Sequence, residues 1–248
     1  MNTETNTGPS PQDAQFCGES PPLSERERLP ITTFVIYVAT FLIVWSLRAT
    51  VFIGVDDRIQ SGIWKNVYSN AVKFFVWVVP VFIILKVFRL RPLRYLKLST
   101  RVNSRCLIIS VIVVAIWMSG VVLGESLLAG KPVEMILFQR STDWPSILAG
   151  VFFSPISEEI LFRGFFLNRL NESLSFWKSN IIAAVLFVAV HMPYWVSKNG
   201  FSIRVMRDLV NVFLLGCLFG WVMKRTNSLW PAIGAHIANN FISGLIRA

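Results

Sequence analysis

The sequence predicts an all-α protein, a polytopic bundle with about seven transmembrane helices, or eight. Of the 248 residues, 54% are hydrophobic and 15% are charged, against roughly 25% charged in typical soluble domains. The apolar residues are grouped in blocks of about 20, the length at which a helix crosses a bilayer. Inside hydrocarbon each block must be helical, because its backbone polar groups find no water to bond.

Residues 1–30 differ from the remainder of the chain. They are rich in Pro, Ser, Thr and Asn and contain few large apolar side chains. Such a segment buries too little surface to offset the entropy lost on ordering, so we expect a disordered polar tail. It lacks the basic start and the apolar stretch of a signal peptide. Residues 31–248 are expected to form one membrane-embedded domain.

Seven apolar blocks define the expected helices. They lie at about 32–53, 68–88, 104–129, 146–167, 180–196, 207–224 and 229–246. The fifth block is short, and Pro193 is expected to kink or end its helix, because proline lacks the N–H and its ring collides with the preceding turn.

The basic residues predict the orientation in the membrane. The connection after the second block contains no acid and seven bases: Lys86, Arg89, Arg91, Arg94, Lys97, Arg101 and Arg105. Such a loop is typical of the cytoplasmic side. Alternation then places the N-terminus and the Lys224–Arg225 turn in the cytoplasm as well, in a multi-pass protein of the cell membrane. We expect the lipid bilayer as a partner and no nucleic acid, because the bases have little polar face on which to gather.

A few polar residues fall inside the blocks, where charge is costly and is usually kept for function. Glu158 and Glu159 lie in the fourth block, and His191 lies in the fifth. His236 and Asn240 lie in the seventh, and the chain has two histidines in all.

Helical spacing separates the roles of the two glutamates. Glu159 and Arg163 are four residues apart, so an ion pair on one helix face is expected. Glu158 points about 100° away, lacks this partner and is expected to face the interior of the bundle. His236 and Asn240 also share a face, and with His191 they can converge on Glu158.

This set of groups suits two kinds of chemistry. Two imidazoles and a carboxylate suit zinc with a water in the open position, with His191, His236 and Glu158 as metal ligands. Glu158 would then remove a proton from the metal-bound water, and Asn240 would stabilise the oxyanion. The same groups also suit a proton- or ion-coupled site, and the spacing does not choose between the two.

Three motifs resemble those of a known family: Glu-Glu-x-x-x-Arg at 158–163, Phe-x-x-x-His at 187–191 and His-x-x-x-Asn at 236–240. In this order they resemble the CPBP family of CAAX proteases and bacteriocin-processing enzymes, also called Abi. The stretch from Gly216 to Asn240, with Leu229-Trp230-Pro231-Ala232, is similar to the family's C-terminal signature. The resemblance covers about residues 146–246, the expected catalytic region.

The resemblance implies a helical bundle of the CAAX prenyl protease type with a conical cavity. It implies a CPBP-type intramembrane metalloendopeptidase that hydrolyses peptide bonds of membrane-associated or peptide substrates. By motif position, Glu158 is the general base and His191 holds the water or a metal, most simply zinc. His236 and Asn240 would bind the metal or the oxyanion, and Glu159 and Arg163 would support the site.

Two other functions remain open on the sequence. One is a non-catalytic immunity or scaffold protein, which would bind a peptide or a membrane partner through the basic loop 86–105, with Phe88 and Tyr95 nearby. The other is a transporter with Glu and His as a proton relay. We find no pair of similar halves, a common feature of transporters.

Overall fold

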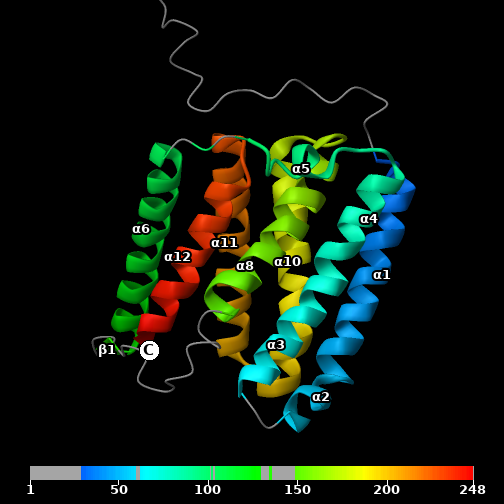
Figure 1. The fold of residues 1–248 in the computed structure, drawn as a ribbon. Helices are drawn as coiled ribbons and strands as arrows, with labels where there is room; N and C mark the ends of the chain where they lie inside the picture. Colours follow the sequence, from blue (N-terminus) through cyan, green and yellow to red (C-terminus); the bar gives the residue numbers. More distant parts are fainter. Residues whose placement is uncertain are drawn as a thin grey trace, which may run out of the picture.

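The computed structural model is a bundle of helical rods packed side by side (Figure 1). It describes residues 29–59, 62–100, 102, 104–129, 134–135 and 149–247. The expected disordered tail lies outside the described residues, apart from Leu29 and Pro30, and remains a prediction.

Within the described residues the chain forms seven rods of helix. The first is α1 (Ile31–Thr50), followed by the short α2 (Ile53–Arg58). The second runs through α3 (Gly62–Lys73), the π-helical η3 (Phe74–Val78) and α4 (Val79–Val87). After the short α5 (Pro92–Tyr95), the third is α6 (Ser104–Ala129).

The fourth rod contains both glutamates. It runs through η4 (Ala149–Phe153), α8 (Ser154–Glu159), η5 (Ile160–Leu167) and α9 (Asn168–Asn171), of which η4 and η5 are π-helical. The last three rods are α10 (Phe176–Asn199), α11 (Ile203–Thr226) and α12 (Trp230–Leu245). A minimal antiparallel pair joins β1 (Glu134–Met135) and β2 (Ile246–Arg247).

The rods coincide with the seven predicted blocks, and the all-α fold class is confirmed. Five helices among the described residues are long and apolar enough to cross a bilayer: Ile31–Thr50, Val67–Val87, Cys106–Gly124, Phe176–Asn199 and Ile203–Thr226. The other two rods, residues 149–171 and α12, contain most of the expected site residues. A total of seven or eight spans therefore stays a prediction.

Of the two outcomes expected at Pro193, an end of the helix is wrong, and a kink stays a prediction. Helix α10 continues through Pro193 to Asn199. One turn before it, the indole N–H of Trp45 donates to the Val190 carbonyl at 3.0 Å. Pro193 has no N–H to donate to the Ala189 carbonyl four residues earlier, so the bond from Trp45 ties the adjacent carbonyl to α1 without replacing the missing one.

The basic loop lies at the same end of the bundle as the start of α1 and the α11–α12 turn (Figure 1). Leu229 N–H donates to the Lys97 carbonyl at 3.1 Å, and the Trp230 indole donates to the Leu98 carbonyl at 2.9 Å. The helix directions thus agree with the alternation inferred from charge. The side of the membrane that this end faces stays a prediction.

An aromatic cluster holds the fourth rod against the first two. Phe162 lies 5.7 Å from Trp77 and 5.3 Å from Phe166, measured between ring centroids and with the rings nearly perpendicular. Phe41 contacts Trp77 and Phe166 in the same way, at 5.5 and 6.0 Å. Edge-to-face pairs of this kind add roughly 0.5–1.5 kcal/mol each beyond the area that they bury. The cluster fixes the rod that contains the two glutamates.

Small residues bring α10 and α11 close together. A Cβ on Gly220 would lie 1.9 Å from the Asn180 side-chain oxygen, and one on Gly216 would lie 3.0 Å from the Ala184 Cβ. The Asn180 amide donates to the Cys217 carbonyl at 2.9 Å across this contact. The close approach places the backbone of α11 beside the fourth rod.

Candidate active site

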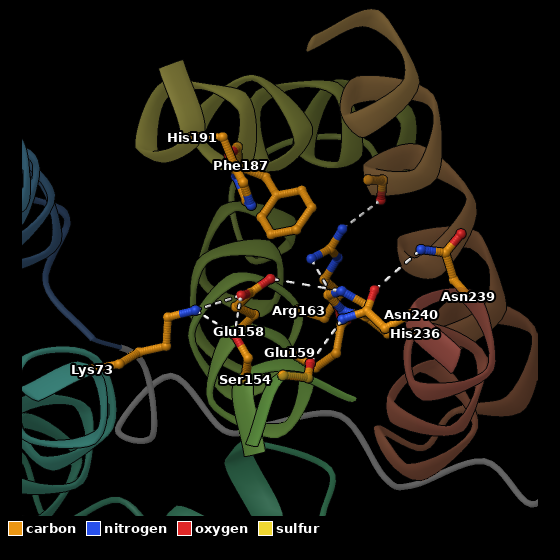
Figure 2. Close-up of polar contacts among 12 residues, drawn as sticks. Lys73, Ser154, Glu158, Glu159, Arg163, Phe187, His191, His236, Asn239 and Asn240 are labelled. Atoms are coloured by element: carbon orange, nitrogen blue, oxygen red, sulfur yellow. Dashed lines mark hydrogen bonds and ion pairs between the residues drawn. The ribbon is translucent and has the colours of Figure 1, made fainter. Parts of the chain in front are cut away.

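The expected polar residues gather from separate rods into the interior of the bundle (Figure 2). Glu158 and Glu159 close α8, immediately before the π-helical η5. His191 comes from α10 and His236 from α12. Glu158, Glu159 and His236 are buried. Wide π-helical turns are frequent at functional sites, where they re-aim side chains.

Glu159 binds two partners through one oxygen. Arg163 Nη1 donates to Glu159 Oε1 at 3.0 Å, which is the ion pair expected from the spacing. His236 Nδ1 lies 2.8 Å from the same oxygen. Arg163 also donates through Nη2 to the Gly216 carbonyl at 3.1 Å, and its guanidinium lies 4.5 Å from the Phe187 ring centroid. The guanidinium thus compensates the charge of the buried carboxylate.

The bond to Glu159 sets the orientation of His236. A carboxylate only accepts, so the network assigns the ring proton to Nδ1 and leaves a lone pair on Nε2. His236 Nε2 lies 3.7 Å from Glu158 Oε2. The ring also stacks on Phe219, at 4.8 Å between centroids and 23° between planes. His236 therefore bonds Glu159 through Nδ1 and faces Glu158 with Nε2.

His191 presents the same nitrogen to the site. Its Nδ1 lies 2.7 Å from the Phe187 carbonyl, which can only accept, so the ring proton is assigned to Nδ1 and the lone pair to Nε2. In Figure 2 the ring lies beside Phe187 and on the same side of the site as Glu158. Both imidazoles thus have an unprotonated Nε2.

Glu158 does not share the Arg163 partner of Glu159, and it has an ionic partner of its own that the sequence-based predictions did not include. Lys73 Nζ lies 2.6 Å from Glu158 Oε1, and Ser154 Oγ donates to the same oxygen at 2.8 Å. Lys73 comes from α3, so spacing along the fourth rod carries no information about it. One signal was available in the sequence, because Lys73 is a charged residue inside the apolar block 68–88.

Asn240 differs from its expected position. In the described part of the chain its amide contacts groups other than Glu158. Nδ2 donates to the Gly150 carbonyl at 3.2 Å, and Oδ1 accepts from Asn239 Nδ2 at 3.2 Å. The shared face with His236 is therefore insufficient to place Asn240 against the glutamate, because the two residues are a full helical turn apart.

The donor groups fit zinc in chemical type. Two imidazole nitrogens with free lone pairs and one carboxylate oxygen are zinc ligands. Across the described residues, no three His, Cys, Asp or Glu side chains are grouped closely enough to hold a metal ion as they stand. The zinc assignment to His191, His236 and Glu158 stays a prediction.

A cavity of about 160 Å³ adjoins the site. Lys73 and His191 line it, together with an aromatic wall formed by Trp45, Trp77, Tyr194 and Trp195. Lys73 contacts both this cavity and Glu158, so the cavity lies next to the glutamate. Its volume and aromatic lining suit one bulky apolar side chain.

Residues 140–242 match the family model described as "Type II CAAX prenyl endopeptidase Rce1-like". This part of the chain, called the Rce1-like region below, is similar to that family. The match contains all three motifs, and the resemblance to the CAAX proteases is confirmed over this region. Lys73 lies outside the Rce1-like region. With its apolar helices, the chain is an integral membrane protein.

A curated relative gives a second, weaker similarity. The chain is 28% identical over 94 residues to a Bacillus subtilis protein named "Putative membrane peptidase YdiL". That alignment covers 38% of this chain and 34% of the relative, so the chain spans about a third of the length of the curated protein it matches. No solved structure matches the chain.

Proposed function

We propose that this protein is an intramembrane endopeptidase that hydrolyses peptide bonds of membrane-associated or peptide substrates with water activated by Glu158. The observation that carries the proposal is the pair of atoms Glu158 Oε2 and His236 Nε2. They face each other at 3.7 Å inside an Rce1-like region. At this separation the two atoms do not bond each other directly, and one water lying beside them can donate a hydrogen to each.

In the proposed reaction, Glu158 Oε2 takes a proton from the water as its oxygen attacks the carbonyl carbon of the scissile bond. The lone pair on His236 Nε2, or the one on His191 Nε2, accepts the second water hydrogen and orients the nucleophile. As the C–N bond breaks, protonated Glu158 returns its proton to the leaving nitrogen. Asn240 supplies a neutral N–H to the oxyanion once its amide releases the Gly150 carbonyl.

The proposal includes a divalent metal, with zinc as the first candidate. His191, His236 and Glu158 are the residues that would hold it. Bound zinc acts as a Lewis acid on water or a carbonyl. Zinc content measured on purified protein, and activity before and after a chelator, test this part separately from the role of Glu158.

From the aromatic cavity we propose that the substrate has a bulky apolar side chain near the cleaved bond. It adjoins His191 and Lys73, so such a side chain would lie next to the reacting groups. We further propose a location in the cell membrane with the N-terminus in the cytoplasm, based on the basic loop before α6.

The test is cleavage of a peptide library by the purified protein in proteoliposomes. Glu158→Gln is expected to lower cleavage by at least about 100-fold, the lower range for loss of a general base. His236→Ala is expected to lower it as well, whereas Asp208→Asn on the exposed part of α11 serves as the matched control. Cleavage unchanged in both site variants contradicts the proposal. Biological activity that survives in Glu158→Gln favours the non-catalytic scaffold or immunity protein.

A further inference from the structure

We propose that Lys73 is a positioning residue of this active site: its ammonium group fixes one oxygen of Glu158, so that the other oxygen is presented to the imidazoles. This inference rests on the proposed function. It concerns a residue of α3 that lies outside both the three motifs and the matched region.

The two carboxylate oxygens of Glu158 have different neighbours. Oε1 accepts from Lys73 Nζ at 2.6 Å and from Ser154 Oγ at 2.8 Å. Lys73 Nζ and Ser154 Oγ also contact each other, which closes a triangle around this oxygen. Oε2 lies 3.7 Å from His236 Nε2. Rotation of the carboxylate would break two charge-assisted bonds, so Oε2 is the oxygen held toward the site.

The ammonium group is itself held in place. Lys73 Nζ lies 4.7 Å from the centroid of the Trp77 ring, within the range of a cation–π contact. Trp77 is fixed in turn by Trp45 at 4.7 Å and by Phe162 at 5.7 Å between ring centroids. An aromatic face and a carboxylate therefore confine the charge of Lys73, as a positioning role requires.

The two buried glutamates have different kinds of ion pair. Arg163 and Glu159 belong to one rod, and their side chains are 2% and 0% exposed. Lys73 and Glu158 come from different rods, and their side chains are 16% and 7% exposed. Lys73 also lines the cavity beside His191. The first pair is sealed inside the bundle, whereas the second borders the space proposed for substrate.

This arrangement predicts that loss of the Lys73 charge affects kcat and KM differently. Lys73 holds the carboxylate, and methionine in its place keeps an unbranched side chain of similar length beside Trp77, so the lining of the cavity changes little. Removal of its charge is therefore expected to lower kcat and to leave KM nearly unchanged. Substitution by arginine retains a cation and hydrogen-bond donors, so it is expected to restore part of kcat.

The experiment compares Lys73→Met, Lys73→Arg and Lys65→Met with the wild-type protein in proteoliposomes, using a peptide that the wild type cleaves. Lys65 lies on the same helix, two turns before Lys73, and provides a matched loss of lysine. Lys73→Met is expected to lower kcat by roughly 10–100-fold, the range for loss of a group that orients a site residue. Lys73→Arg is expected to recover at least part of this loss, and Lys65→Met is expected to retain wild-type kcat.

The outcomes separate this inference from the proposed function. Wild-type kcat in Lys73→Met, together with loss of activity in Glu158→Gln, overturns the inference and leaves the function intact. Activity retained in Glu158→Gln overturns the proposed function, and with it the inference about Lys73 that rests on it. If both Lys73 variants lose kcat equally and also have a lower Tm in detergent, the lysine only holds the helices together, and the inference is overturned.

A second variant keeps the proposal testable if Lys73→Met does not fold. Ser154→Ala removes the other donor to Glu158 Oε1 and retains the charge of Lys73. We expect kcat to fall by roughly 2–10-fold with KM unchanged, the effect of one lost hydrogen bond. Wild-type kcat in Ser154→Ala would show that the orientation of Glu158 does not depend on its Oε1 donors.

Discussion

Glu159 Oε1 lies 2.8 Å from His236 Nδ1, so one buried carboxylate determines which imidazole nitrogen faces Glu158. This bond is the kind of outer contact that fixes the tautomer and the ring orientation of a functional histidine. The same oxygen accepts from Arg163 at 3.0 Å. The glutamate next to the proposed general base therefore orients a site residue, as well as forming an ion pair.

We expect Glu159→Gln to lower kcat by about 10–100-fold, because a neutral amide is a weaker acceptor for the His236 N–H and leaves Arg163 uncompensated. The measurement is steady-state cleavage in proteoliposomes. Glu172→Gln is the control, since Glu172 accepts from the Tyr95 hydroxyl at the end of the bundle, away from the site. Equal kcat in Glu159→Gln and wild type would show that His236 keeps its orientation without this carboxylate.

The Arg163–Glu159 pair predicts strong coupling in stability. Arg163→Met leaves a buried carboxylate without its cation, which is expected to cost about 3–5 kcal/mol. The double variant Arg163→Met with Glu159→Leu removes both charges and is expected to recover much of this loss. Thermal unfolding in detergent of the two single variants and the double variant gives the interaction energy. Additive effects would contradict the ion pair.

Gly220 predicts a packing effect where α10 crosses α11. Gly220→Ala places a Cβ 1.9 Å from the Asn180 side-chain oxygen, so we expect a loss of about 1–3 kcal/mol from overpacking. Gly124→Ala on α6 is the matched control, because its Cβ would meet no atom within 4 Å among the residues described. Thermal unfolding in detergent distinguishes them, and an equal Tm for the two variants would show that the crossing relaxes without cost.

Lys97, in the loop between α5 and α6, predicts a dependence of stability on pH. Burial, together with the nearby charge of Lys224, lowers the pKa of Lys97 to about 8 from its usual 10.5. Between these values the unfolded protein binds more protons than the folded protein, so stability rises as the pH increases from about 8 to 10.5.

The measurement is thermal unfolding in detergent across this pH range. Lys97→Met is expected to flatten the rise, because its side chain does not titrate. Lys178→Met, which removes an exposed lysine on α10, is expected to retain it. A Lys97→Met profile parallel to that of the wild type would assign the rise to another group.

Much of this protein follows from one-dimensional patterns. The apolar blocks predict the seven rods, because a backbone in hydrocarbon has no alternative to the helix. The spacing of four residues predicts the Glu159–Arg163 pair, since both belong to one continuous rod. The motifs around Glu158, His191 and His236 predict the Rce1-like region. In each case the information is local to one helix or is carried by the order of the motifs.

The tertiary structure decided the contacts between helices. The bond from His236 to Glu159, the cation beside Glu158 and the contacts of the Asn240 amide all depend on how the rods rotate and pack. Helical periodicity specifies the face on which a side chain lies, and the neighbour that meets this face is set by packing. The sequence by itself thus determined the helices and the chemical groups of the site, whereas side-chain packing between distant segments decided which of these groups touch.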